Sequence, residues 1–206
     1  MKIYVAIAMA ILSSVAISAR NAAEVFTSAP DNIVRLLPQS TRLDMVDYFS
    51  FGSSKPSTNS LSGEARVTQL SDKSITAQID NSVSMQMVVL PQKSDTVFAV
   101  ITTLSVPFDD SSIKFYSSDW KPLESPLFVL PTYKEWINAD GLKKIKDIEI
   151  ALPFFPIKAQ FDPEASTLTL VNNSSEYLGV AASDFKGLLI DKKTFKVVPG
   201  KFIPLQ

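Results

Sequence analysis

Residues Val83 to Tyr116 read VSMQMVVLPQKSDTVFAVITTLSVPFDDSSIKFY and carry the strongest hydrophobic pattern in the chain. In the first part, apolar side chains occupy every second position and so share one face of an extended strand: Val83, Met85, Met87 and Val89. Residues 97–101 are apolar on both faces, which is typical of a buried central strand, and residues 91–95 form a polar break of turn-forming type. The pattern predicts an antiparallel hairpin whose second strand lies inside a sheet.

Alternating patterns on both sides of this hairpin extend the predicted sheet. Residues 66–70 and 74–79 alternate around a short polar turn before the hairpin, and residues 157–161 and 166–171 do so around the turn DPEA near the C-terminus. Because the connections are short, strands that are consecutive in sequence should pair with each other. We therefore expect two antiparallel meanders.

Two short helices are expected before the sheet. Ser28 is placed to cap the first, which should end at Pro38, and Thr41 and Asp44 have the spacing of a capping box that starts the second. Gly52 is the expected stop of the second helix. Its sheet-facing side should carry the residues Leu43, Val46, and Phe49 or Ser50.

A third helix is predicted from Thr132 to Gly141, with Glu135 completing a capping box and Trp136 and Ile137 in the core. The next segment reads IKDIEIAL and is expected to be a strand. Its apolar side chains alternate with charged or small ones: Ile148, Ile150 and Leu152.

Together these patterns predict an α+β fold over residues 24–206, in which an antiparallel β-sheet from two meanders carries a few helices packed on it. The two meanders also share an order of turns. That similarity leaves open a two-lobed pseudo-repeat, with lobes at residues 24–125 and 126–206.

The N-terminal residues 1–23 predict export. Lys2 is followed by a continuous apolar run and then by small residues, as in a secretory signal peptide, and cleavage is expected between Ser14 and Ala23. The alternative interpretation is an N-terminal transmembrane anchor. No later stretch is long and apolar enough to span a bilayer, so we expect a periplasmic or secreted protein without a transmembrane segment in its mature form.

The chain contains no cysteine and no histidine. Disulfides, thiolate chemistry, Ser-His-Asp triads and histidine-ligated zinc sites are therefore excluded. Its 20 basic and 21 acidic side chains are balanced and form no basic run, so nucleic-acid binding is not expected. The sequence points to no cofactor and no metal.

Two pairs of acidic residues are candidates for chemistry. Asp109 and Asp110 precede two serines and could offer oxygens to Ca²⁺, but they lack the spacing and the glycine of a calcium-binding loop, which favours a solvated turn. Asp44 and Asp47 could act as the paired carboxylates of a hydrolase, although acids near a helix N-terminus also stabilise the helix. No Ser-x-x-Lys motif stands at a helix start, so no nucleophile is identified and we do not expect an enzyme.

Aromatic residues in two proline-containing segments are candidates for contact with a ligand or partner. In the motif LPFFP, at least one of Phe154 and Phe155 should face outward, unless the motif is only a strand-end bend with both rings buried. Trp120 lies in another such segment and should pack over the sheet edge.

The triplet Asp95-Thr96-Val97 matches the O-glycan acceptor pattern of some exported bacterial proteins. It lies at the expected hairpin turn, where a transferase could reach the hydroxyl of Thr96. Mass spectrometry of the native protein tests this prediction, and an unmodified Thr96 would remove it.

Two segments resemble a family of exported proteins of the Bacteroidales that is classified only as a domain of unknown function. They read RLLPQSTRLDMVDYF, residues 35–49, and FAVITTLSVPFDDSSIKFYSSDWKPL, residues 98–123. The similarity covers essentially the whole mature chain. It implies an α+β domain in the envelope of a Gram-negative anaerobe or secreted from it, and it transfers no catalytic or binding residue.

Two hypotheses for function follow. The first is a non-enzymatic envelope protein that binds a partner protein or a ligand through a sheet face or through the loops around Trp120 and Phe154. The second is a carrier for an apolar small molecule, such as a lipid or lipoprotein-like ligand, in a cavity between sheet and helices. The second predicts a cavity lined by Met85, Met87, Phe98 and Phe115.

Overall fold

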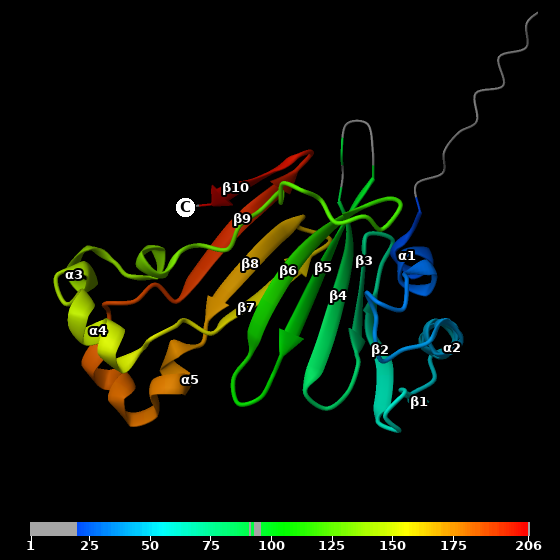
Figure 1. Ribbon diagram of the computed structural model, residues 1–206, viewed down its shortest axis with the longest axis horizontal. Coiled ribbons are helices and arrows are strands. Elements are labelled where there is room, and N and C mark those ends of the chain that lie inside the picture. Colours follow the sequence, from blue (N-terminus) through cyan, green and yellow to red (C-terminus); the bar gives the residue numbers. More distant parts are fainter. Residues whose placement is uncertain (1–19, 91, 93–95, 206) are drawn as a thin grey trace, which may run out of the picture.

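The computed structural model describes residues 20–90, 92 and 96–205 and contains two antiparallel sheets (Figure 1). Six strands in sequence order form the first sheet: β1 Ser57–Thr58, β2 Glu64–Leu70, β3 Ser74–Gln78, β4 Val83–Leu90, β5 Val97–Leu104 and β6 Asp110–Ser117. Four strands in reverse order form the second: β10 Lys201–Leu205, β9 Lys192–Val198, β8 Thr167–Asn172 and β7 Ile157–Asp162. The predicted α+β fold with two antiparallel meanders is confirmed.

The helices lie at the two ends of the molecule (Figure 1). Two of them pack on the side of the first sheet that faces away from the second sheet: α1 Ala22–Ser28 and α2 Gln39–Ser50. The others gather at the far end of the second sheet: η1 Tyr133–Trp136, α3 Ala139–Leu142, α4 Ile145–Ala151, α5 Ser174–Leu178 and η2 Gly179–Phe185. Of the predicted signal peptide, residues 1–23, the first 19 lie outside the described residues, whereas Ala22 and Ala23 are already part of α1.

The first helix differs from the prediction. Ser28 ends α1 instead of capping a later helix, and residues 30–37 fold as a series of turns. The capping box of Asn21 and Glu24 begins α1, and this start was missed because residues up to 23 were assigned to the signal peptide. Pro30 then disfavours a helical conformation in the residue before it, so the helix stops there.

The second helix exists, but it buries a different side. Gly52 follows its C-terminus with a φ of 68°, as predicted for a helix stop. Much of the predicted sheet-facing side is exposed: Leu43, Phe49 and Ser50. The side chains that reach the core are Arg42 and Met45, with Val46 partly buried beside them. The apolar-stripe prediction was wrong because a buried arginine cannot be recognised from hydrophobicity.

The third predicted helix is broken into two short pieces. The capping box of Thr132 and Glu135 is present but starts only η1, and Gly141 lies inside α3. A β-carbon at Gly141 would lie 2.5 Å from the carbonyl oxygen of Leu188, so this close approach requires glycine. Trp136 is buried as predicted.

The segment IKDIEIAL is a helix, α4, and the predicted strand is wrong. Ile148 and Leu152 are buried, whereas Ile150 is 84% exposed. Side chains four residues apart share one side of a helix, and the residue midway between them points away. Ile148 and Leu152 fit both periods, whereas Ile150 fits only that of a strand, and packing at the end of the second sheet selects the helix.

The first sheet buries both of its faces, which explains why its central strands are apolar on both sides. Its helix side contributes residues to one core: Ile75, Met87 and Phe98. Its other side packs Val88, Ala99 and Phe115 against the second sheet. The second sheet contributes buried side chains to the same core: Phe161, Leu170 and Phe195. The predicted central hairpin, β4 with β5, is therefore confirmed.

Side chains of the first sheet bind the free edge of β7. The amide of Gln86 accepts a hydrogen bond from the backbone N–H of Phe161 and donates one to its carbonyl oxygen, both at 2.8 Å. The Ser111 hydroxyl accepts from the N–H of Ala159 at 2.9 Å. These β7 residues alternate along the strand, so the edge away from β8 is satisfied by side chains instead of another strand.

The carboxylate of Asp109 adds an ion pair across the same joint, 2.6 Å from the ammonium of Lys158. This contact lowers the pKa of Asp109, with help from a hydrogen bond with Ser105. A lowered folded-state pKa means that the stabilisation is present above the unfolded value of about 3.9 and is lost as the pH falls through the folded value. Asp109 and Asp110 thus hold the two sheets together, since Asp110 accepts from the N–H of Ile157.

We expect Asp109→Asn to destabilise the fold by about 0.5 kcal/mol at neutral pH, because both partners are partly exposed. The difference from the parent chain should vanish as the pH falls below the lowered folded-state pKa, where the carboxylate is protonated in both states. Urea unfolding at neutral and acidic pH measures both values. An equal difference at the two pH values would show that the ion pair contributes nothing.

Candidate functional site: a groove on the sheet face

The segment between α1 and α2 lies over the helix side of the first sheet and leaves a groove of about 470 Å³ beneath it. We call this the sheet-face groove. One wall is the segment Asn32–Leu36, and the floor and other wall come from the sheet: Ile79, Val83, Met85, Val100, Thr102, Ser112, Lys114 and Tyr116. The volume falls in the range of about 300–1,000 Å³ that is usual for small-molecule sites.

The strand register gives the groove an apolar end and a polar end. Met85 of β4 lies opposite Thr102 of β5, which lies opposite Ser112 of β6. In the next row, Val100 lies opposite Lys114. The floor therefore changes from buried apolar side chains at β4 to hydroxyl and ammonium groups at β6.

The wall over the groove is held in place by the buried side chain of Arg42. Its guanidinium donates to the carbonyl oxygen of Ala29 at 2.6 Å and to that of Leu37 at 2.9 Å, the two ends of the segment. It also pairs with the carboxylate of Asp31 at 3.2 Å. Burial lowers the pKa of Arg42, and the neighbouring Asp31 opposes that shift. Arg42 therefore fixes the position of the groove wall without lining the groove itself.

Two cations lie among the groove residues, and no carboxylate does. Arg35 comes from the overlying segment and Lys114 from β6, and both are exposed. Neither forms an ion pair with any residue that the structure describes. The described groove lining is thus apolar in the middle and positive at its rim.

Aromatic rings close one end of the groove. Tyr116 lines it and packs 5.8 Å from the ring of Trp120, which in turn lies 4.9 Å from the ring of Phe98. Burial raises the pKa of the Tyr116 phenol, which keeps it neutral at physiological pH. The indole N–H of Trp120 is buried and has no hydrogen-bond partner among the described residues.

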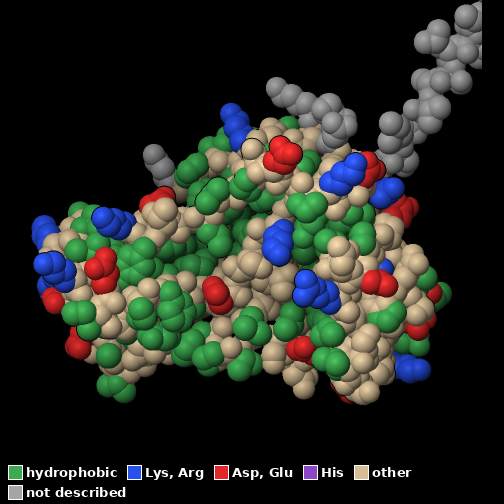
Figure 2. All heavy atoms as spheres, in the orientation of Figure 1, with side chains coloured by type: hydrophobic (Ala, Val, Ile, Leu, Met, Phe, Trp, Pro, Cys, Tyr) green, Lys and Arg blue, Asp and Glu red, His purple; other side chains and the backbone are tan. Residues whose placement is uncertain are grey.

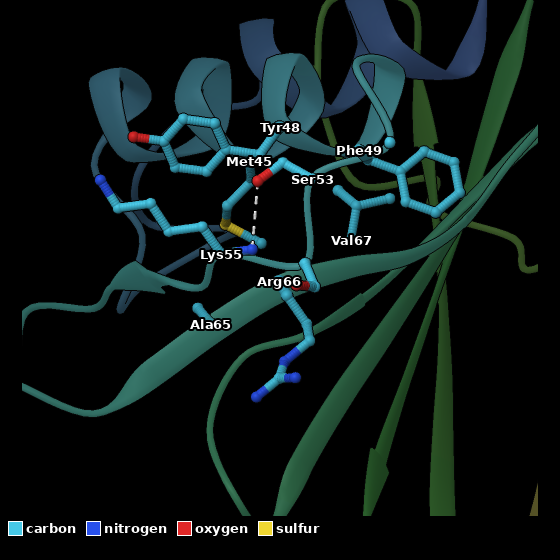
Figure 3. Close-up of a pocket in the computed structure, with 10 residues that line it drawn as sticks. Met45, Tyr48, Phe49, Ser53, Lys55, Ala65, Arg66 and Val67 are labelled. Atoms are coloured by element: carbon cyan, nitrogen blue, oxygen red, sulfur yellow. Dashed lines mark hydrogen bonds between the residues drawn. The ribbon is translucent and has the colours of Figure 1, made fainter.

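A second hollow, of about 440 Å³, lies between the end of α2 and β2 (Figure 3). Met45 points from the helix toward the strand, while Lys55 extends beside Tyr48, with its ammonium 5.3 Å from the ring centre. Arg66 points away from the helix and pairs with Glu64 at 2.8 Å. The two cations of this second hollow, Lys55 and Arg66, thus already have partners within the protein.

A third hollow lies between the two sheets and is lined mainly by neutral polar groups. Two adjoining parts, of about 580 and 210 Å³, share Gln69 of β2 and Gln160 of β7. Several of the polar groups around it are occupied by the fold: Thr68 donates to the carbonyl of Thr76, and Gln86 holds β7. The polar groups of this inter-sheet cleft are therefore partly used to hold the fold together.

The structure places the predicted aromatic contact residues in separate environments. Trp120 packs over the sheet edge, as expected. Phe155 is partly buried against Tyr133, whereas Phe154 is 50% exposed and contacts Tyr177, so one ring of the LPFFP motif faces outward as predicted. Figure 2 shows many hydrophobic side chains over the half of the molecule that contains α4 and α5. A binding role for these three residues stays a prediction.

The predicted lining of an apolar cavity needs correction. Met85 lines the sheet-face groove, but Met87 and Phe98 are fully buried in the core beneath the helices. Phe115 lies on the opposite face of the sheet, against the second sheet. Phe98 lies opposite Tyr116, and successive side chains of a strand face opposite sides, so Phe115 cannot share a cavity with the other three.

The other candidates are placed as follows. Thr96 is half-buried just before β5, and Asp95 of the predicted glycosylation triplet lies outside the described residues. Asp44 and Asp47 are both exposed on α2. Within residues 20–90, 92 and 96–205, no cluster of three or more acidic side chains could hold a metal ion.

Comparison with known proteins identifies the family. Residues 14–202 match the family described as Protein of unknown function (DUF3256). The chain belongs to this family. A solved domain of an uncharacterized protein from Porphyromonas gingivalis W83 has the same fold as this DUF3256 protein, with a TM-score of 0.75 and 20% sequence identity. The match covers 89% of this chain and 96% of that chain, and none of the curated proteins matches.

The family assignment confirms the predicted resemblance to a domain of unknown function, and the solved relative is from the Bacteroidales. Export of this DUF3256 protein stays a prediction. No helix in the described parts of the chain has the length and hydrophobicity needed to cross a membrane.

Proposed function

We propose that this protein is a non-enzymatic, exported binding protein that holds a small apolar ligand in the sheet-face groove. The observation that carries the proposal is the groove itself, in which buried Met85 and Val100 form an apolar floor open to the surface. An apolar concavity with a few polar groups at its rim is the usual form of a small-molecule site.

The groove suits a small molecule better than an added strand of a partner protein. A peptide that extends a sheet must pair with a free strand edge, whereas the groove lies on the sheet face. Strands β4 and β5 at its floor are already paired on both sides. Contacts there would be made by side chains, with the backbone segment of residues 32–36 as the opposite wall.

Export follows from the predicted signal peptide, with the protein placed in the periplasm or secreted. The folded domain supports a cleavage point at or before Arg20. The Asn21 side chain caps α1, and the N–H of Ala22, which is fully buried, bonds to the carbonyl of Asp72. Recovery of an uncleaved chain from the cytoplasm of the host would contradict export.

The binding proposal is tested by displacement of a fluorescent apolar dye from the purified protein by dodecanol. We expect Thr102→Trp, which places an indole over the groove floor, to weaken dodecanol binding at least about tenfold. Thr68→Trp is the matched control, because it makes the same change on the exposed inter-sheet side of the first sheet.

Three outcomes would overturn this proposal. Binding that is lost in Thr68→Trp and kept in Thr102→Trp would move the ligand to the inter-sheet cleft. No displacement by any apolar ligand would remove the ligand-binding function. Turnover of a peptide, glycan or ester substrate by the purified protein would contradict the non-enzymatic assignment.

A further inference from the structure

We infer that the ligand is an anionic amphiphile with a single alkyl or acyl chain, whose headgroup is bound by Lys114 and Arg35 at the rim of the sheet-face groove. This inference rests on the proposed function, because it assumes that the groove is occupied. It adds the chemical class of the ligand and its orientation.

The first support is the charge of the lining. Both charged groups of the groove are cationic, and none of its described lining residues is acidic. Over the whole chain, basic and acidic side chains are nearly equal in number. On the face shown in Figure 2, the two kinds are interspersed. The positive rim is therefore a local feature of the groove and complements a negative headgroup.

The second support is that these cations are available. Two other arginines of the N-terminal half have acidic partners: Arg42 is bound to Asp31, and Arg66 to Glu64. Lys114 and Arg35 have no acidic partner among the described residues. An ammonium and a guanidinium on opposite walls can both donate hydrogen bonds to one carboxylate or phosphate placed between them.

The third support is the direction of the polarity. Thr102 and Ser112 flank Lys114 on the floor and add hydroxyl groups to the same end, while Met85 lies at the other end. A chain that lies across β5 would bury its methylene groups against Met85 and Val100 and leave its head near β6. A ligand with a neutral headgroup could bind at the apolar end but would leave the cations at the other end without a partner.

The test compares three ligands of equal chain length by calorimetry: dodecanoate, dodecanol and dodecylammonium. We expect dodecanoate to bind at least about tenfold more tightly than dodecanol and dodecylammonium to bind most weakly. Lys114→Glu should lower dodecanoate affinity at least about tenfold while leaving dodecanol affinity nearly unchanged, and Arg35→Glu should act in the same direction. Lys73→Glu, an exposed residue in the β2–β3 turn, is the control with the same change of net charge.

The three ligands and the variants separate failure of this inference from failure of the proposed function. Equal affinity for all three ligands would overturn the anionic assignment and leave groove binding intact. An effect of Lys73→Glu equal to that of Lys114→Glu would show that only net charge matters, which also overturns it. Absence of binding by every ligand would remove the proposed function itself. Circular dichroism and thermal melting confirm that each variant is folded.

Discussion

Replacement of Gln86 by leucine should destabilise the protein by about 2–5 kcal/mol, although the side chains are similar in size. Gln86 is 6% exposed, and its amide satisfies both the N–H and the carbonyl oxygen of Phe161 between the two sheets. Leucine leaves both backbone groups buried without partners, and each costs about 1–3 kcal/mol. Urea unfolding monitored by tryptophan fluorescence measures the loss.

A control on β7 itself separates this effect from the general cost of an added apolar residue. Gln160 is exposed next to Phe161, and Gln160→Leu should change stability by less than about 0.5 kcal/mol. Gln86→Glu adds a second check. Burial and the facing carbonyl should raise its folded-state pKa, so its deficit relative to the parent chain should shrink as the pH falls. Equal stabilities of Gln86→Leu and Gln160→Leu would mean that the β7 edge is not held as described.

Removal of Arg42 should have the second large effect, a loss of about 2–4 kcal/mol in Arg42→Ala. The carbonyl oxygens of Ala29 and Leu37 would lose their donors, and the buried stem of the side chain would leave a void. The wall of the groove would lose its attachment at both ends. Ligand affinity should therefore fall together with stability, as measured by urea unfolding and by dodecanol binding.

The matched control is Arg66→Ala, which removes an exposed arginine and should cost less than about 0.5 kcal/mol. Arg42→Lys keeps the charge but has one donor group in place of the guanidinium fork, so it should give an intermediate loss. An Arg42→Ala protein that is as stable as Arg66→Ala would contradict the role of Arg42 in holding residues 30–37.

The secondary structure could be predicted where the hydrophobic residues follow the period of a strand or of a helix alone. Residues 83–87 of β4 alternate and residues 97–101 of β5 are apolar on both faces, so only a hairpin inside a sheet fits them. The segment IKDIEIAL fits both a strand and a helix, because Ile148 and Leu152 are compatible with either period. Contacts with residues far away in sequence, such as Leu189, decide that case and cannot be read locally.

The groove could not be predicted, although the sequence indicated binding through a sheet face. Its wall exists because residues 30–37 are not helical, and the prediction of a helix there was wrong. Arg42, the residue that fixes this wall, looks like a surface residue in sequence. Lys114 could have been found, since it is the single charged side chain of β6 after Asp110, in the pattern SSIKFYS.

Methionine methyl groups offer the most direct test of where the ligand binds. The expected mature chain retains three methionines: Met45, Met85 and Met87. Met85 lines the sheet-face groove, Met45 lines the hollow beside α2, and Met87 is in the core. One spectrum of the three methyl resonances therefore reports on both hollows and on the core. The resonance of Met85 is assigned by its loss in Met85→Leu.

We expect titration with dodecanoate of protein labelled at its methionine methyls to shift the resonance of Met85 strongly, that of Met87 weakly and that of Met45 not at all. A shift confined to Met45 would place the ligand beside α2. Saturable binding that leaves the Met85 resonance unmoved would contradict the groove as the binding site.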